Sequence, residues 1–310
     1  MAIRKMTDLV GSTPLVEVEG IPVPHGSRIL AKLEMWNPGG SVKDRLGIRL
    51  LEDAFERGLI DEATTIIEPT AGNTGIGLVL AAKKFGLQTI FTIPEKFSIE
   101  KQVLIEALGG KIVHTPTGDG MKGAIEEARA LQRRIPNSYV PLQFENPINP
   151  STYYETMGPE IIQDLEGGRI ASFVAGAGSG GTFIGTSAYL KEQDDRIRTA
   201  VVEPEGSVLG GGPAHDHETE GIGMDAMPAF MNAGQFDSVY TISDGKAFHY
   251  VDELAKKSGL LVGSSSGAAF AACIEEAAIL PPGSTIVTIF PDSSERYLSK
   301  NIYQKENQKI

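Results

Sequence analysis

The feature that most limits the fold of this chain is an alternation of short β-branched runs with longer helix-like segments. Between residues 64 and 115 the runs TTIIE, QTIFTIP and KIVHT are separated by the segments GIGLVLAAKKFG and KFSIEKQVLIEALGG. A second series, at 171–292, has the same rhythm. This alternation is typical of βαβ units, whose strands are parallel. We therefore predict an α/β fold with two mostly parallel twisted sheets, each flanked by helices.

The composition excludes several classes of partner. A formal net charge of −12 repels phosphate backbones, and no cluster of Lys and Arg is interleaved with aromatic residues. No stretch reaches the ~18 apolar residues of a membrane helix, and the start, MAIRKMTDLVGSTP, lacks the apolar core of a signal peptide. We expect a cytoplasmic protein that binds neither nucleic acid nor membranes.

The cysteine and histidine content argues against a disulfide and against a metal site. Cys273 is the single cysteine and lies in an alanine-rich run, where a core thiol is expected. His215 and His217 form the one close histidine pair, and neither a cysteine nor a second pair stands at zinc-binding spacing. No metal is expected.

Lys43 follows a glycine-rich turn in the segment NPGGSVKDR at 37–45. Ser41 and Asp44 have the spacing of a capping box, which predicts a helix start near Val42 and puts Lys43 in the first turn. The positive end of the helix dipole disfavours a cation there. This favours the neutral amine as a nucleophile toward a carbonyl cofactor. A solvated lysine on a helix surface is the alternative.

The segment TAGNTG at 70–75 lies between a predicted strand and a predicted helix. Its backbone N–H groups and two hydroxyls suit a carboxylate, and the Asn73 amide suits a phenolic oxygen. A plain structural turn is the alternative. The segments GSSSG at 263–267 and PDSSERY at 291–297 also place hydroxyls near predicted helix starts or after a strand, where simple N-caps are common.

The run GAGSGGT at 176–182 is again a strand, a loop and a helix, and its free amides suit a phosphate. The same letters spell GxGxxG, and Glu203 ends the next predicted strand about where a dinucleotide-binding fold places its ribose carboxylate. A nicotinamide-dependent oxidoreductase therefore stands as an alternative from these residues.

Taken together, these segments resemble the cysteine synthase and cystathionine β-synthase family, in the same order and over essentially the whole chain. NPGGSVKDR is similar to the family's lysine motif, TAGNTG to its substrate loop, GSGGT to its phosphate-binding loop and SSSGAA to its pyridine-nitrogen contact. The resemblance implies the two-domain fold shared with the tryptophan synthase β chain. It implies a smaller α/β domain at 44–147 with the substrate loop, a larger α/β domain at 1–43 plus 148–310 that binds the phosphate, and a homodimer.

The resemblance also implies the cofactor, pyridoxal 5'-phosphate (PLP), and the residues that bind it. Lys43 would bind the aldehyde covalently and act as the catalytic base, Asn73 would bond the 3-oxygen and Ser265 would face the ring nitrogen. The cofactor phosphate would be bound by Gly178, Ser179, Gly180, Gly181 and Thr182. The substrate carboxylate would be held by Thr70, Ala71, Gly72, Asn73, Thr74 and Gln143. Glu203 becomes an ordinary strand-end residue on this resemblance.

Two positions depart from the most common family pattern. Ala71 stands where the family usually has serine, so one hydroxyl of the substrate loop is missing. In the run EGIGMD at 220–225 an acidic residue follows EGIG, which is more similar to the cystathionine β-synthase branch. We expect Gly221 and Asp225 to contact the second substrate, with Asp225, helped by Glu220, recognising the ammonium group of homocysteine.

The predicted reaction is β-replacement on O-acetylserine or serine by a thiol, with homocysteine as the thiol and cystathionine as the product. We expect neither the haem segment nor the regulatory module of the animal enzymes, because the sequence resembles the short bacterial forms, which tend to use O-acetylserine. A cysteine synthase that uses sulfide, with release of hydrogen sulfide from cysteine as a side reaction, is the alternative within the family. The expected partners are small amino acids and thiols.

Overall fold

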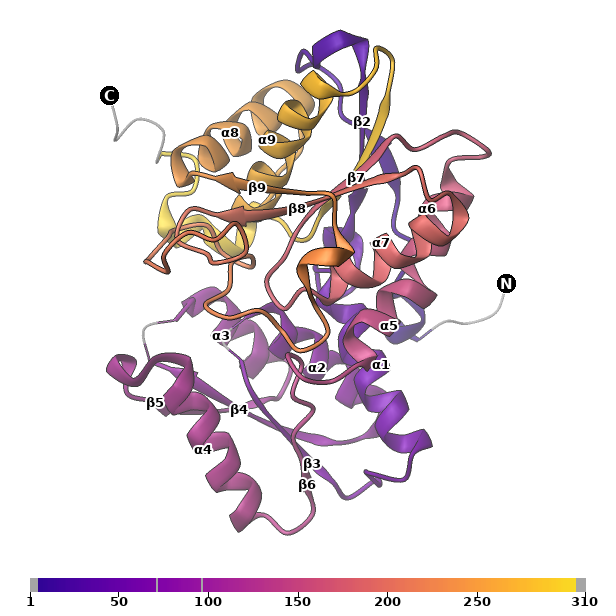
Figure 1. Cartoon of the computed structure of the whole chain (residues 1–310). Coiled ribbons are helices and arrows are strands. Elements are labelled where there is room, and N and C mark those ends of the chain that lie inside the picture. The colour runs from indigo at the N-terminus through magenta and orange to yellow at the C-terminus, as the bar shows by residue number, and fades with distance from the viewer. Residues whose placement is uncertain (1–4, 71, 96, 305–310) are drawn as a thin grey trace. The chain divides into compact units, whose positions relative to one another are not determined.

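The computed structural model describes residues 5–70, 72–95 and 97–304. Contacts within the chain divide it into two compact units (Figure 1). Unit 1 contains the segment that ends at Val10 together with Asn37–Ile148. Unit 2 contains Gly11–Trp36 and the chain from Asn149 onward. In this division Lys43 belongs to unit 1, and the phosphate-binding loop expected at Gly178 belongs to unit 2.

Unit 1 is built on a parallel four-stranded sheet with the strand order β5-β4-β3-β6. Its strands are β3 (Thr65–Pro69), β4 (Gln88–Pro94), β5 (Lys111–Thr115) and β6 (Ser138–Tyr139). The first three coincide with the three β-branched runs of the first series, within one residue. The prediction of parallel βαβ units is therefore confirmed for this part of the chain.

Helices cover both faces of the unit 1 sheet (Figure 1). Ile67 of β3 packs with Ala128 of the fourth helix on one face. Phe91 points to the opposite face, where it lies near Gly75 and Ile105 of two other helices. The helices are α1 (Lys43–Glu56), α2 (Asn73–Phe85), α3 (Ile99–Ala107) and α4 (Gly120–Arg134).

Unit 2 is built on a six-stranded sheet with the order β1-β2-β10-β7-β8-β9. All neighbouring strands are parallel except β1 and β2, which pair antiparallel. The strands are β1 (Leu15–Glu17), β2 (Arg28–Leu33), β7 (Ser172–Gly176), β8 (Arg198–Pro204), β9 (Ser238–Ile242) and β10 (Thr285–Phe290). The last four are the runs expected from the second series.

Strands β1 and β2 lie outside the two predicted series, and Lys32 explains why β2 is hard to find. Its side chain is fully buried, although a lysine inside a central strand is rare. The Lys32 ammonium donates to the Thr13 carbonyl oxygen at 2.6 Å and to Asp164 at 2.7 Å, and it lies 3.1 Å from Glu160. Contacts distant in sequence therefore make a charged residue compatible with this strand.

Unit 2 also has helices on both faces of its sheet (Figure 1). Val174 of β7 joins a core cluster with Val251 and Phe270 of the helices on one face. Its neighbour Phe173 points the other way and stacks on Phe183, with ring centroids 5.9 Å apart. The helices are α5 (Ile148–Glu155), α6 (Met157–Asp164), α7 (Gly181–Gln193), α8 (Asp244–Ser258) and α9 (Ser264–Ile279).

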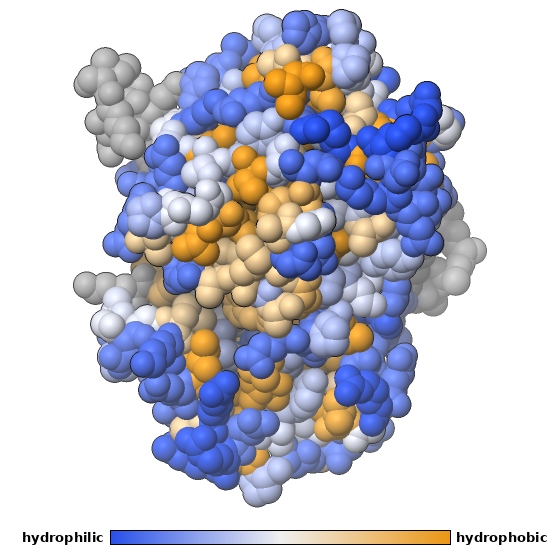
Figure 2. All heavy atoms as spheres, viewed as in Figure 1, coloured by the Kyte–Doolittle hydropathy of each residue, from blue (hydrophilic) through white to orange (hydrophobic). Residues whose placement is uncertain are grey.

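Six short 3-10 helices complete the described structure. They are η1 (Met6–Leu9), η2 (Pro24–Gly26), η3 (Glu34–Trp36), η4 (Thr117–Asp119), η5 (Ala233–Gln235) and η6 (Ser294–Lys300). Among the residues that the structure describes, none of the helices is long and apolar enough to span a bilayer. Hydrophilic residues cover much of the face drawn in Figure 2.

Candidate active site

Lys43 is the first residue of α1 and is half-buried. The Ser41 hydroxyl oxygen accepts a hydrogen bond from the Lys43 backbone N–H at 3.3 Å. The predicted helix start is confirmed, but the capping is different. Val42 is the N-cap residue, and its side chain forms no capping hydrogen bond; the Asp44 amide donates to the Ser41 carbonyl oxygen at 3.2 Å. The Asp44 carboxylate accepts from the Gly39 amide, so it closes the glycine turn that precedes the helix.

Gly47 of α1 and Gly77 of α2 allow the two helices to approach closely, and this packing sets the position of Lys43 relative to α2. A Cβ atom built on Gly77 would lie 2.4 Å from the Lys43 carbonyl oxygen, and one built on Gly47 would lie 2.4 Å from the Gly77 carbonyl carbon. Side chains at these two positions would therefore separate α1 from α2. Because Asn73 is the first residue of α2, this packing relates the starts of the two helices that carry the Lys43 and Asn73 candidates.

The substrate loop predicted at 70–75 joins the end of β3 to the start of α2. The Thr70 hydroxyl oxygen accepts from the Gly72 amide at 3.3 Å, which shapes the turn. Ala71 lies outside the described residues. The Thr74 hydroxyl donates to Gln143 Oε1 at 2.8 Å, and both side chains are buried. The structure thus brings together two substrate-binding candidates that are far apart in sequence.

Glu68 was not among the residues that the sequence singled out. It is almost completely buried in β3, two residues before Thr70. Its carboxylate accepts from the backbone amides of Leu142 at 3.2 Å and Gln143 at 3.4 Å. Burial raises the pKa of Glu68 to about 7, and the two amide hydrogen bonds oppose part of that rise. The available signal was a single acidic residue in the apolar run TIIEP, immediately before a candidate loop.

The glycines of the loop between β7 and α7 form a cradle that has no room for side chains. A Cβ on Gly181 would lie 1.9 Å from Asn149 Oδ1, and one on Gly178 would lie 2.5 Å from the Gly221 carbonyl oxygen. Gly180 has φ +81°, which favours glycine. Beyond this turn, the first amides of α7 have no acceptor within their own helix. The loop therefore fits a phosphate group bound by backbone N–H groups.

Asn149 is a second residue that the sequence did not indicate. It is completely buried, and its side-chain nitrogen donates to Ser179 Oγ at 3.0 Å, inside the predicted phosphate-binding loop. Gly181 also lies close to the Asn149 side chain, so Asn149 contacts the loop at two positions. Asn149 lies in an Asn/Pro-rich stretch that local patterns identify only as a connection.

The three serines at the start of α9 lie in different surroundings. Gly263, not a serine, is the N-cap of α9, so simple capping does not account for Ser265. Ser265 is buried, and a Cβ on Gly221 would lie 3.8 Å from its hydroxyl oxygen. Ser264 Oγ accepts from the Glu220 amide at 3.0 Å. The Ser266 hydroxyl is buried and has no hydrogen-bond partner in the described structure.

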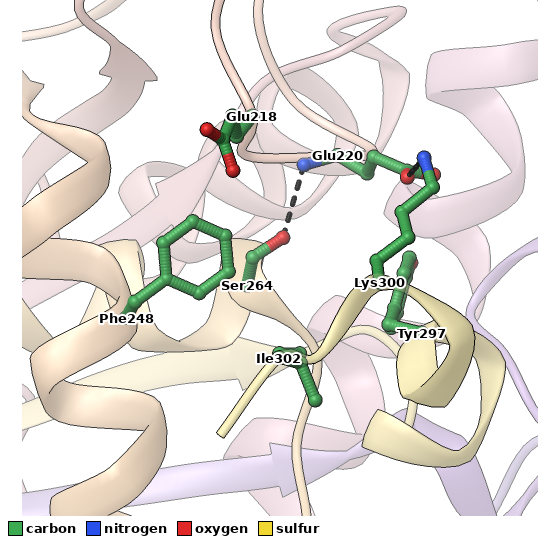
Figure 3. A pocket seen from close by; sticks show the side chains of 7 residues that line it. All are labelled: Glu218, Glu220, Phe248, Ser264, Tyr297, Lys300 and Ile302. Atoms are coloured by element: carbon green, nitrogen blue, oxygen red, sulfur yellow. Dashed lines mark hydrogen bonds and ion pairs between the residues drawn. The ribbon is translucent and has the colours of Figure 1, made fainter. Parts of the chain in front are cut away.

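The segment 218–225 runs past the start of α9 and is held at several points. Figure 3 shows a small pocket beside it. The pocket is lined by Glu218, Glu220, Phe248, Ser264, Tyr297, Lys300 and Ile302. The Glu220 carboxylate forms an ion pair with Lys300, which gives this side chain a structural partner within unit 2 (Figure 3).

Asp225 follows two anchored residues. The Gly223 amide donates to the Ala177 carbonyl oxygen at 2.8 Å, which ties the segment to the phosphate-binding loop. The Met224 amide donates to Ser207 Oγ at 3.0 Å, and the Met224 side chain is buried. The Asp225 side chain is exposed. An acidic group therefore projects from a segment whose backbone is attached to the candidate cofactor loop.

Glu203 is the residue on which a dinucleotide site would depend, and its carboxylate forms hydrogen bonds with the loop that follows β8. It is completely buried, and its carboxylate accepts from the amides of Leu209 and Gly210, each at 2.8 Å. The Thr241 hydroxyl also donates to it at 2.8 Å. A carboxylate that holds two backbone amides and a hydroxyl is not available to a ribose. Among the described residues, no cluster of His, Cys, Asp and Glu could hold a metal ion.

Two α/β units with mostly parallel sheets, a lysine at a helix start and a glycine cradle suited to phosphate are features of an enzyme that binds PLP. The model of the family described as "Pyridoxal-phosphate dependent enzyme" matches residues 6–292, and the chain belongs to this family. The cofactor and the enzyme class predicted from the sequence are confirmed. The PLP enzyme fold is also confirmed, because solved relatives share it over nearly the whole chain.

Among curated proteins, the chain is 55% identical to the O-acetylserine dependent cystathionine beta-synthase of Bacillus subtilis (strain 168), over 97% of this chain and 98% of the relative. It is 56% identical to a cysteine synthase of Helicobacter pylori (strain ATCC 700392 / 26695), over 98% and 99% of the two chains. The crystal structure of O-acetylserine dependent cystathionine beta-synthase from Helicobacter pylori matches with TM-score 0.93 and 56% identity, over 98% of this chain and 99% of that chain.

A more distant relative is a hydrogen sulfide-producing enzyme from Fusobacterium nucleatum. It matches with TM-score 0.91 and 37% identity, over 96% of this chain and 100% of that chain. These relatives are named for the synthesis of cystathionine, the synthesis of cysteine or the production of hydrogen sulfide, so their names differ in the sulfur compound. The family resemblance inferred from the motifs is therefore confirmed. The names do not identify the thiol that this enzyme uses.

Proposed function

We propose that this PLP-dependent enzyme exchanges the acetate of O-acetylserine for the sulfur of a thiol, with homocysteine as the preferred thiol and cystathionine as the product. The observation that carries the choice of homocysteine is the exposed Asp225 on a segment anchored to the phosphate-binding loop. Homocysteine has an ammonium group at the end remote from its sulfur, and sulfide has none. Two relatives named O-acetylserine dependent cystathionine beta-synthase, at 55% and 56% identity, support the same choice.

The described residues fit PLP as the cofactor. In this proposal Lys43 would bind it covalently, Asn73 would bond its 3-oxygen and Ser265 would face its ring nitrogen. The backbone amides from Gly178 to Thr182 would bind the phosphate, because this loop offers N–H groups in a cradle with no room for side chains at its glycines. When it is bound, PLP supplies an electron sink for the Cα of an amino acid.

The chemistry of the protein itself is positioning and proton transfer. Thr74 and Gln143 hold the carboxylate of O-acetylserine. Lys43, freed when the amino group of the substrate takes its place on the aldehyde, removes the proton from Cα as general base. Acetate leaves from Cβ, the thiolate adds to the same carbon, and Lys43 returns the proton to Cα. The neutral Ser265 hydroxyl would not hold the ring nitrogen protonated as a carboxylate would, and this would favour early departure of the β-substituent over transamination.

The Asp225→Asn variant tests the choice of thiol. A hydrogen bond to a charged group contributes ~1.5–3 kcal/mol. Its loss should reduce kcat/KM for homocysteine about ten- to 150-fold, with little effect on sulfide, at a fixed concentration of O-acetylserine. The control is Asp195→Asn, which removes an exposed carboxylate just before the start of β8, away from the phosphate-binding loop. Equal losses with both thiols would assign Asp225 a structural role, and no loss with either would remove it from the site.

Cysteine synthesis from sulfide is the second candidate, and the Helicobacter relatives named cysteine synthase favour it. It would be supported if wild-type kcat/KM for sulfide exceeded that for homocysteine. The same assays with serine in place of O-acetylserine identify the leaving group. Release of sulfide from cysteine is a further side reaction to measure, since a solved relative is named as a hydrogen sulfide-producing enzyme.

We propose in addition that the enzyme is a cytoplasmic homodimer, as the family resemblance implies. Sedimentation of the PLP-loaded protein should then give a mass near twice the 33.1 kDa of one chain. A mass near that of one chain would contradict the homodimer.

A further inference from the structure

The buried carboxylate of Glu68 holds two consecutive backbone amides, those of Leu142 and Gln143. Strand pairing does not supply these amides with acceptors. β3 and β6 pair with Thr65 beside Ser138 and Ile66 beside Tyr139, and β6 then ends. The chain continues through Pro141, which has no N–H to donate. The Glu68 side chain therefore joins β3 to the chain that follows β6, at the point where the backbone hydrogen bonds between the two strands end.

The turn held by Glu68 is conformationally unfavourable without support. Leu142 has φ +55°, in the left-handed region that residues with a Cβ rarely adopt. Its carbonyl oxygen accepts from the amides of Glu145 at 2.9 Å and Asn146 at 3.0 Å, which closes the turn on its other side. Hydrogen bonds on both sides of Leu142 thus maintain a backbone that would otherwise relax to an extended form.

The turn determines where the Gln143 side chain points. Thr74 donates to Gln143 Oε1 at 2.8 Å, so the carbonyl end of the Gln143 amide faces the start of α2. The amide nitrogen is then the group that Gln143 offers to an anion, because a side-chain amide has one acceptor and one donor end. Rotation of the turn would withdraw this donor and break the contact with Thr74.

We propose that Glu68 is a positioning residue for the amino-acid substrate, which holds the Leu142 turn so that the Gln143 amide nitrogen and the Thr74 backbone N–H bind the substrate carboxylate. This inference rests on the proposed roles of Gln143 and Thr74. The cost of burying Glu68, seen in the rise of its pKa to about 7, supports it, because a neutral apolar residue would fill the strand without that cost. In this proposal Glu68 acts on the substrate only through the turn that carries Gln143.

The test uses the PLP-loaded, full-length Glu68→Gln variant, which keeps the size of the side chain but presents an N–H group to one of the two amides. We expect KM for O-acetylserine to rise about tenfold or more, with kcat and KM for the thiol nearly unchanged. The second measurement requires no turnover. It is titration with L-alanine, followed through the visible absorbance of the cofactor, and its Kd should rise by the same factor. L-Alaninamide, which has no carboxylate, should bind wild type and variant equally.

The matched control is Glu276→Gln. Glu276 is also completely buried, but it accepts hydrogen bonds from Ser172, Arg198 and Tyr240, away from the candidate loops. This variant should be less stable without a change in KM for O-acetylserine. An equal rise in KM in both variants would show a general effect of destabilisation and would overturn the proposal.

Two further variants separate the inference from the proposed function. If Gln143→Ala leaves the Kd of L-alanine unchanged, the proposed role of Gln143 fails. If Gln143→Ala weakens binding and Glu68→Gln does not, only the positioning role fails. Should Glu68→Gln not fold, Glu68→Asp decides, because it keeps the charge but is too short to reach both amides. A raised KM in that variant supports the proposal and an unchanged KM overturns it.

Discussion

The stability of this protein should fall as Glu68 ionises, and the burial of Glu68 sets the size of the effect. Burial raises the pKa of Glu68 to about 7 in the folded protein, against 4.5 for an ordinary glutamate. One pH unit of difference corresponds to ~1.4 kcal/mol. The ionised carboxylate therefore lowers the free energy of unfolding by about 3 kcal/mol at alkaline pH.

The direction follows from the proton count of the two states. Between pH 4.5 and about 7 the folded protein retains a proton on Glu68 that the unfolded chain has already released. The unfolded state binds fewer protons in this window, so the free energy of unfolding decreases as the pH rises. Below 4.5 the carboxyl group is protonated in both states and contributes nothing. Above about 7 the full penalty is present.

The assay compares Glu68→Gln with the wild type by urea denaturation at pH 5 and pH 8, with saturating PLP. The variant cannot ionise at this position. The difference in free energy of unfolding should therefore move in its favour by about 2.5 kcal/mol between the two pH values. A difference in free energy of unfolding that is the same at both pH values measures the change in hydrogen bonding when the carboxylate is replaced by an amide. The control Glu62→Gln makes the same change at an exposed glutamate of the same unit, so it measures the effect of the substitution at a surface position. A Glu68→Gln difference that is the same at pH 5 and pH 8 would refute the reasoning.

Three other predictions concern the cofactor. Borohydride reduction of the PLP-loaded enzyme followed by peptide mapping should place the label on Lys43, and a label on another lysine would contradict its assignment. Gly181→Ala should weaken retention of PLP on dialysis about tenfold, because its Cβ would lie 1.9 Å from a buried Asn149 oxygen. Gly245→Ala, with nothing within 4 Å of the added atom, should retain PLP normally. Ser265→Asp should keep the fold, slow β-elimination and accumulate a long-wavelength visible band with O-acetylserine, and unchanged turnover would argue against a contact with the ring nitrogen.

The sequence was sufficient for the fold class and for most of the strands. The runs at 88–94 and 111–115 correspond to β4 and β5 residue for residue, because a buried strand between two helices needs a short, apolar, β-branched segment. Lys43 at a helix start and the glycine loop after β7 were also found locally, since each depends on the backbone of a few consecutive residues. The resemblance to a PLP enzyme family rested on these same short motifs.

Other features depended on contacts between residues far apart in the chain. β2 was missed because its buried Lys32 is compatible with a strand only when Asp164 and a distant carbonyl oxygen pair with it. Asn149 lies in a stretch whose local pattern predicts only a connecting segment, and its hydrogen bond to Ser179 forms only in the folded chain. The spacing of Ser41 and Asp44 located the helix start but not the hydrogen bonds that form there.

The sequence by itself determined which segments form strands and helices and which short loops suit a phosphate, an aldehyde and a carboxylate. Local patterns carry this information because they record which face of an element is buried and where the backbone needs glycine. The tertiary structure decided that Glu68 holds the amides of the Gln143 turn, whereas the similar strand-end Glu203 holds a different loop. Both residues read as Glu-Pro at a strand end, and their partners differ because strand register and loop path, which no local pattern encodes, decide which amides each carboxylate can reach.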